Sequence, residues 1–189
     1  MSPKDSLREE HGVMMKMLAV LQQFFEKRKA PIEFQDGEAE DLETLIEFFE
    51  IYVDRNHHGK EEQHIFPALS RDGTPDIDFL IDSLIADHCR ARKDIQKIKS
   101  LVLAIHTCPG DESNDFSMVA QNYVELVRKH IRKENSELLP LIEERLSETE
   151  RLHIGKQFLE LEKSIPGVGG VQTFMVSAGK LYQKYRLHL

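Results

Sequence analysis

Two stretches of the sequence carry the same pattern of histidine and glutamate. His57 precedes Glu61 by four residues, and His130 precedes Glu134 by the same interval. Residues four apart are neighbours on the surface of an α-helix, so each histidine shares one face with its glutamate. Imidazole and carboxylate groups together are suitable ligands for iron, manganese or zinc. The pattern therefore predicts two helical segments that contribute to a metal site.

The two stretches are repeats of one another. Residues 57–67 read HHGKEEQHIFP, and residues 130–140 read HIRKENSELLP. The residues His, Lys, Glu, two apolar residues and Pro fall at the same offsets in both. The alignment selects His57 and Glu61 as the equivalents of the histidine and glutamate in the second repeat.

Two further histidines, His11 and His88, each interrupt an apolar stripe. Apolar residues recur around them at steps of three and four, the spacing of a core-facing helix surface. Burying an imidazole or carboxylate without a partner costs on the order of several kcal/mol, and a bound cation would compensate all such groups at once. The four stripes are Leu7, His11, Met14, Leu18, Leu21 and Phe25; Ile46, Phe49, Val53, His57, Glu61 and His64; Leu84, His88, Ala91, Ile95, Ile98, Val102 and Ile105; and Tyr123, Val127, His130, Glu134 and Glu137.

Four polar residues lie next to these candidates in the sequence. We expect His58 and Glu62 to face solvent or to support the ligands, since outer carboxylates commonly orient metal-bound imidazoles. Glu10 and Asp87 each directly precede a histidine of an apolar stripe. Because adjacent helical residues project about 100° apart, we expect these two to point elsewhere.

Hydrophobic periodicity and proline or glycine breaks predict the helices that position these residues. Capping boxes are predicted at Ser6 with Glu9 and at Ser147 with Glu150, and Thr74 is predicted to cap a helix that begins at Pro75. Residues 106–114 are predicted to form a loop. Six helices are expected, over residues 6–29, 38–70, 75–105, 115–145 and 147–164, and after a break at 165–170 a last one that ends near 185.

The fold expected from these elements is all-α. Four long helices with short connections predict an up-down-up-down bundle in residues 1–146, with residues 147–189 as a helical extension packed on it. In antiparallel helices, positions equally far from a connection lie at one level. His11 lies 22 residues before residue 33 and His57 lies 24 after it. The other two connections give similar matches, so we expect all four helices to bring their polar groups to one level.

Composition limits the class of protein. The 189 residues suit one domain, and the net charge of −8 leaves no basic surplus for a nucleic-acid partner. No apolar run approaches the length of a membrane span or a signal peptide, so we expect no membrane association and a cytoplasmic location. Cys89 and Cys108 make neither a disulfide framework nor a Cys-x-x-Cys clip. We expect Cys89 to be an ordinary buried residue.

The combined pattern His…His-x-x-x-Glu…His…His-x-x-x-Glu resembles the hemerythrin-like (HHE cation-binding) domain family over residues 7–141. The resemblance implies two iron ions bridged by two carboxylates and an oxo or hydroxo group, with manganese or zinc less favoured. The ligands that it implies are His11 and His57 on one iron, His88 and His130 on the other, and Glu61 and Glu134 as bridges.

One position departs from the oxygen-carrying hemerythrins. In those proteins the third helix contains a His-x-x-x-His pattern. Here His88 is followed four residues later by Arg92. One nitrogen ligand is missing, so we expect an open or water-filled position at both metals and a more reactive or more exchangeable site. A ferritin-like site built on Glu61 and His64 is less favoured, because the second repeat has Glu137 at the position of that histidine.

Together with this resemblance, the observations predict a non-haem di-iron protein that senses, binds or responds to dioxygen, nitric oxide or iron. The expected ligand is a small diatomic molecule. A di-iron oxidase, peroxidase-like or nitric-oxide-handling enzyme is the alternative, and the missing histidine favours it. A helical interaction module with a structural metal is the second alternative. The sequence decides neither whether the protein is an enzyme nor whether it forms a homo-oligomer.

Overall fold

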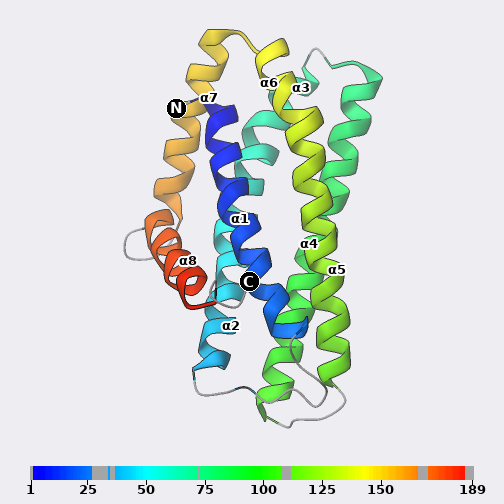
Figure 1. Cartoon of the computed structure of the whole chain (residues 1–189). Helices are drawn as coiled ribbons and strands as arrows, with labels where there is room; N and C mark the ends of the chain where they lie inside the picture. Colours follow the sequence, from blue (N-terminus) through cyan, green and yellow to red (C-terminus); the bar gives the residue numbers. More distant parts are fainter. Residues whose placement is uncertain are drawn as a thin grey trace.

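The computed structural model of the chain describes residues 2–26, 34, 37–71, 73–107, 112–165 and 170–185. These residues form helices and contain no strand, so the predicted all-α fold is confirmed. The elements from α1 to α6 form four long rods, which lie side by side with successive rods running in opposite directions (Figure 1). None of the helices in the described ranges is both long and apolar enough to cross a bilayer.

The four rods follow the four long helices expected from the sequence. The first is α1 (Pro3–Glu26) and the third is α4 (Pro75–Thr107). The second and fourth each contain π-helical segments. The second consists of α2 (Glu38–Glu47), η1 (Phe48–His58), η2 (Glu61–Ile65) and α3 (Phe66–Ser70), and the fourth of α5 (Glu112–Lys133), η3 (Glu134–Leu138) and α6 (Leu139–Arg145).

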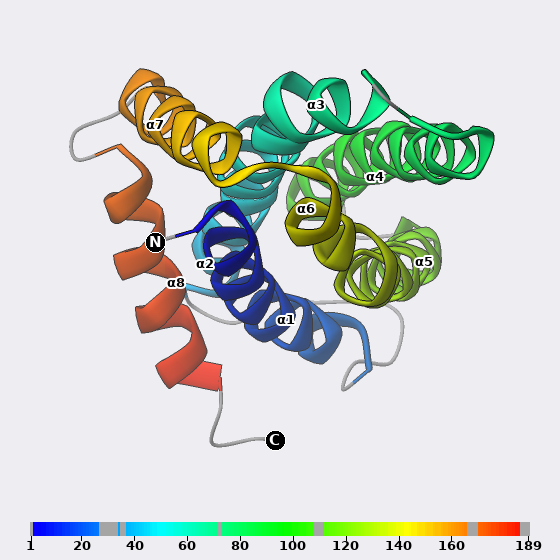
Figure 2. The same ribbon diagram turned by 90° about the horizontal axis from the view of Figure 1, so that it is seen from above.

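The rods contact one another in a closed ring. Helix α1 packs against α5 and against the second rod, and α4 packs against the same two neighbours. The view along the rods shows this arrangement around a central axis (Figure 2). Side chains that point to the axis from all four rods can therefore meet.

The predicted apolar stripes form the interior, and the polar residues divide it into two parts. One apolar cluster contains Met14 and Val53, and the other contains Leu7 and Ile65. Along α1, His11 lies between Leu7 of one cluster and Met14 of the other. The candidate metal residues thus form a polar layer between two apolar cores, where water is excluded.

Some predicted helix ends differ from those observed. Helix α1 begins at Pro3, and the backbone N–H of Asp5 donates to Ser2 Oγ at 3.1 Å, so Ser2 is the cap instead of Ser6. Proline suits the first helical position because its missing N–H has no partner there in any case. The predicted loop at 106–114 is shorter than expected, since α4 continues to Thr107 and α5 begins at Glu112. The predicted end of the first helix at residue 29 lies outside the described residues.

Two further helices cover the side of the bundle formed by α1 and the second rod (Figure 2). Helix α7 (Glu148–Ser164) begins with the predicted capping box, in which Ser147 and Glu150 bond reciprocally. Helix α8 (Val171–Tyr185) places Tyr185 in the larger apolar cluster. Cys89 is exposed instead of buried, because it projects away from the core-facing His88 on α4.

Candidate metal centre

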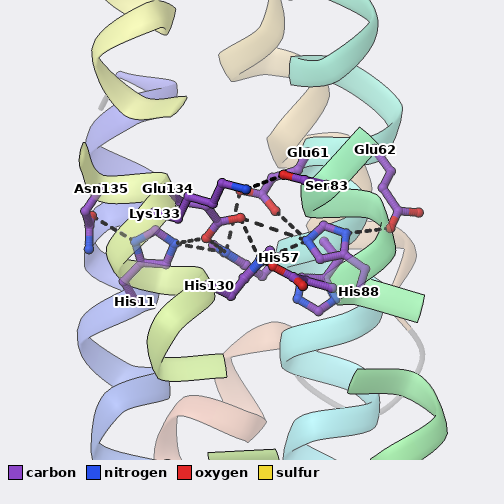
Figure 3. A network of polar contacts seen from close by, with 12 residues as sticks. His11, His57, Glu61, Glu62, Ser83, His88, His130, Lys133, Glu134 and Asn135 are labelled. Carbon is purple, nitrogen blue, oxygen red and sulfur yellow. Dashed lines mark hydrogen bonds and ion pairs between the residues drawn. The ribbon is translucent and has the colours of Figure 1, made fainter. Parts of the chain in front are cut away.

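The structure brings all six predicted residues together inside the bundle (Figure 3). Every one of them is nearly or fully buried. They come from all four rods: His11 from α1; His57 and Glu61 from the second rod; His88 from α4; and His130 and Glu134 from the fourth rod.

The four histidines form two pairs. The Nε2 atoms of His11 and His57 are 3.1 Å apart, and those of His88 and His130 are 3.0 Å apart. Each pair, together with Glu61 and Glu134, forms a group whose donor atoms could hold one metal ion. The two groups share both glutamates.

Each glutamate extends between the two histidine pairs. Glu134 Oε2 lies 3.0 Å from His11 Nε2, and its Oε1 lies 2.7 Å from His130 Nε2. Glu61 is oriented in the same way, with Oε1 at 3.8 Å from His57 Nε2 and Oε2 at 3.4 Å from His88 Nε2. One oxygen of each carboxylate therefore faces each pair, which is the arrangement that a carboxylate shared by two cations requires.

Two π-helical turns position these glutamates. The backbone N–H of Phe66 donates to the carbonyl of Glu61, and that of Leu139 donates to the carbonyl of Glu134, each five residues back. Pro67 and Pro140 follow directly. A proline in a regular helix lacks an N–H and clashes with the carbonyl four residues earlier. The wider turn avoids that clash in both repeats.

Outer polar residues hold the histidines from behind in a ring. His57 Nδ1 bonds Glu10 of the first rod at 2.7 Å, and His88 Nδ1 bonds Glu62 of the second rod at 2.7 Å. His130 Nδ1 lies 3.6 Å from Asp87 of the third rod. His11 Nδ1 bonds Asn135 of the fourth rod at 3.0 Å. Each rod thus supports the histidine of the next one.

This ring corrects one sequence prediction. Glu10 and Asp87 were expected to point away from the centre, yet each faces a histidine of the neighbouring rod. Their roughly 100° offset from the adjacent ligand candidate directs them to the next helix and not to solvent. Glu62 supports His88, as the sequence allowed.

The outer contacts determine which nitrogen is available to a cation. Acceptors behind His11, His57 and His88 fix the proton on Nδ1, which leaves the Nε2 lone pairs directed into the centre. Two such lone pairs about 3 Å apart repel each other unless a proton or a cation lies at them. The donor set thus fits a pair of metal ions.

The carboxylates give a second sign of the same fit. None of the four oxygens of Glu61 and Glu134 has a hydrogen-bond partner among the described residues, although all are buried. Buried polar atoms in proteins are normally hydrogen-bonded, and an unmet one requires an explanation such as an ion. A cation at each histidine pair would satisfy all four.

Without metal, protons provide the compensating charge. Burial opposes charge on His57, but the nearby carboxylates of Glu61, Glu10 and Glu134 raise its pKa to about 10. Burial is likewise outweighed at His88, whose pKa rises to about 11 because Glu134, Glu61 and Glu62 surround it. Glu134 is buried too, yet the nearby histidines hold its pKa well below the usual value.

Two further histidines of the second rod, His58 and His64, lie outside the two histidine pairs. His58 is buried and not solvent-facing, and its ring stacks on that of His88 at 3.7 Å with an interplanar angle of 15°. Burial and the positive charges of His88 and His130 hold its pKa well below the usual range. His58 forms a third group with His88 and His130 that could hold an ion. His64 belongs to none of these groups, so the described residues give the ferritin-like alternative no support.

The fold and this centre define an all-helical protein with a buried histidine and glutamate cluster of the kind that binds metal ions. Residues 2–142 match the family model of the hemerythrin HHE cation binding domain. The chain therefore belongs to this family, as its motifs indicated. Searches among curated proteins and among solved structures give no significant match. Family and cluster together indicate metal binding.

Proposed function

We propose that the protein binds two iron ions in this centre and uses them to bind or sense a small diatomic molecule, dioxygen or nitric oxide. His11 and His57 would hold one iron, and His88 and His130 the other. The observation that carries the proposal is the orientation of the two glutamates, each with one oxygen toward each pair. An oxo or hydroxo bridge, which the family resemblance implies, is part of the proposal.

Iron would supply reversible change between the ferrous and ferric states and a position for an added ligand. Each half-site offers two imidazole nitrogens and one oxygen from each glutamate. Helix α4 contributes only His88, because Arg92 bonds Asp54 at 2.6 Å and Glu62 at 2.7 Å instead of facing the centre. Such a limited set of neutral and anionic donors supports a site with room for a diatomic ligand.

Two cavities among the described residues lie apart from the centre. A cavity of about 440 Å³ is lined by residues such as His64 and His153 between the second rod and α7. Another of about 580 Å³ lies between α2 and α4, near Ile46 and Leu103. Neither is lined by a residue of the centre, so a molecule bound in either cavity would not contact the cluster directly.

Metal analysis with spectroscopy tests the proposal. Protein purified without added metal should contain two iron atoms per chain, and its optical and Mössbauer spectra should change on exposure to dioxygen or nitric oxide. One zinc per chain and no iron would instead support the structural-metal alternative and refute the proposal.

The enzyme alternative draws support from the same open coordination. Anaerobic stopped-flow measurements of the reduced protein separate it from ligand binding. A sensor or carrier should react with about one equivalent of oxidant per centre, whereas an oxidase or a nitric-oxide-handling enzyme should consume many.

A further inference from the structure

Helix α7 reaches the metal centre through one buried lysine. Lys60 has a fully buried side chain, and its Nζ donates hydrogen bonds to Glu10 of α1 and to Glu162 of α7, the second at 2.6 Å. Glu10 in turn bonds His57 Nδ1 at 2.7 Å. These four side chains form a continuous chain from α7 to the histidine pair of His11 and His57.

The charges in this chain depend on one another. The Lys60 ammonium group has no access to water, so the carboxylates of Glu10 and Glu162 must balance its positive charge. The face of the Phe158 ring, 5.2 Å from Nζ, also attracts this charge. Neutralising Glu162 would leave Glu10 to balance Lys60 alone and to bond His57 as well. Because the acceptor behind a ligating histidine sets its orientation and basicity, the loss would reach the centre.

Among the described residues, the second repeat has no equivalent connection. Lys133 occupies the position of Lys60 in the repeat, and its Nζ donates to Ser83 of α4. The family match ends at residue 142, whereas Glu162 lies beyond it. In the part of the chain that the structure describes, the contact therefore joins α7 to the half of the centre that contains His57.

Gly59 provides the space for α7 on the first repeat. A Cβ atom at this position would lie 3.3 Å from Leu161 Cδ2, a distance at which the neighbour must move. The second repeat has Arg132 at the equivalent position. A long side chain there is compatible with the motif but would prevent the close approach of α7.

We propose that Glu162 is a positioning residue of the metal centre, and that docking of α7 controls metal binding at the half-site of His11 and His57. The inference rests on the proposed metal-binding function and adds a control by the C-terminal helices. Coupling between sites is reciprocal, so metal binding must also strengthen the docking of α7.

Glu162→Gln tests the proposal with zinc as a diamagnetic probe. The variant removes the charge but keeps an oxygen that accepts a hydrogen bond. The matched control is Glu160→Gln, which removes the same charge from an exposed position of the same helix, where Glu160 pairs with Lys163 at 2.7 Å. In Glu162→Gln the zinc at His11 and His57 should pass to a chelator faster, by up to the roughly 10- to 100-fold that follows loss of the direct partner of a ligating histidine. The zinc at His88 and His130 should be released at the wild-type rate, and so should both zinc ions of Glu160→Gln.

NMR of the histidine ring protons shows where the effect acts. The Nδ1–H signal of zinc-loaded protein should shift for His57 in Glu162→Gln and stay unchanged for His88. Gly59→Arg should also accelerate zinc release and shift the His57 signal, because the bulk of the new side chain displaces α7. In a Lys60→Met background, Glu162→Gln should have no further effect.

The outcomes separate this inference from the proposed function. Unaltered zinc release and an unaltered His57 signal in Glu162→Gln would overturn the inference while the proposed function stands. Equal acceleration of both zinc ions, or the same change in Glu160→Gln, would also overturn it, since a general loosening of the fold would then be the cause. A wild-type chain that binds neither zinc nor iron would overturn both.

Discussion

Glu134→Ala should remove most of the stability that metal binding gives to the folded chain. The two oxygens of Glu134 face different histidine pairs, at 3.0 Å from His11 Nε2 and 2.7 Å from His130 Nε2. One substitution therefore takes a donor from both half-sites at once. Replacing a single histidine would take a donor from one half-site only.

The expected magnitude follows from binding linkage. A ligand that binds only the folded state stabilises it by RT ln(1 + [L]/Kd), about 2.7 kcal/mol at a free concentration of roughly 100 Kd. Two ions bound at this ratio would contribute about 5.4 kcal/mol. For a chain of this length, each kcal/mol raises Tm by about 2–4 °C, so metal should raise the Tm of the wild type by roughly 11–22 °C.

The assay is calorimetric unfolding with and without metal, combined with metal analysis of the same samples. Glu134→Ala should show only a small part of the wild-type shift and low metal content. His58→Ala is the control, because the repeat alignment selects His57 instead of His58, and His58 belongs to neither of the two groups that contain Glu61 and Glu134. A full shift in Glu134→Ala together with its loss in His58→Ala would refute the assignment of bridging residues.

Three further predictions follow from single features. In the metal-free protein, the pKa values of His57 and His88 are raised to about 10 and about 11, so protonation of these histidines stabilises the fold fully below the unfolded pKa of 6.5. This contribution to the free energy of unfolding should decline above pH 6.5 and vanish beyond about pH 10 to 11. A pH-independent free energy of unfolding of chelator-treated protein would contradict this prediction. Pro140→Ala removes the clash that favours the π turn, so it should lower metal affinity without lowering the stability of metal-free protein, as measured by metal titration and denaturation. Ser147→Ala removes the cap of α7 and should lower the free energy of unfolding by about 1 kcal/mol in urea denaturation.

Much of the centre could be predicted because polar residues interrupt apolar stripes in the sequence. His11 and His88 each replace a hydrophobe at a core position, and the spacing of the connections places them at the level of the two repeats. Whether a residue is buried, and its height along the bundle axis, depend on the helical periodicity and the helix lengths. Both are therefore readable from one sequence.

The outer partners were not predictable by the same reasoning. Glu10 supports His57 on the second rod and not the adjacent His11, and Asp87 supports His130 and not His88. The direction of such a side chain depends on which rod packs beside it and at what rotation. The neighbour and the rotation of each rod are known only from the packed bundle. The apolar stripe of one helix does not determine them.

The π turns explain a subtler error at the end of the stripes. His64 and Glu137 were expected on the core face, three residues after each glutamate, but Glu137 is exposed and His64 only half-buried. The core positions are instead four residues after the glutamates, at Ile65 and Leu138. Steps of four would drift by about 40° each on a regular helix.

Wider π turns remove that drift, which keeps one face directed at the axis through the level of the centre. The sequence signal was present in the proline found six residues after each glutamate, at Pro67 and Pro140. Each proline prevents a regular turn at the place where Glu61 and Glu134 must point inward together. The repeated proline therefore accompanies the histidine and the glutamate in both repeats and favours the turn that directs each glutamate inward.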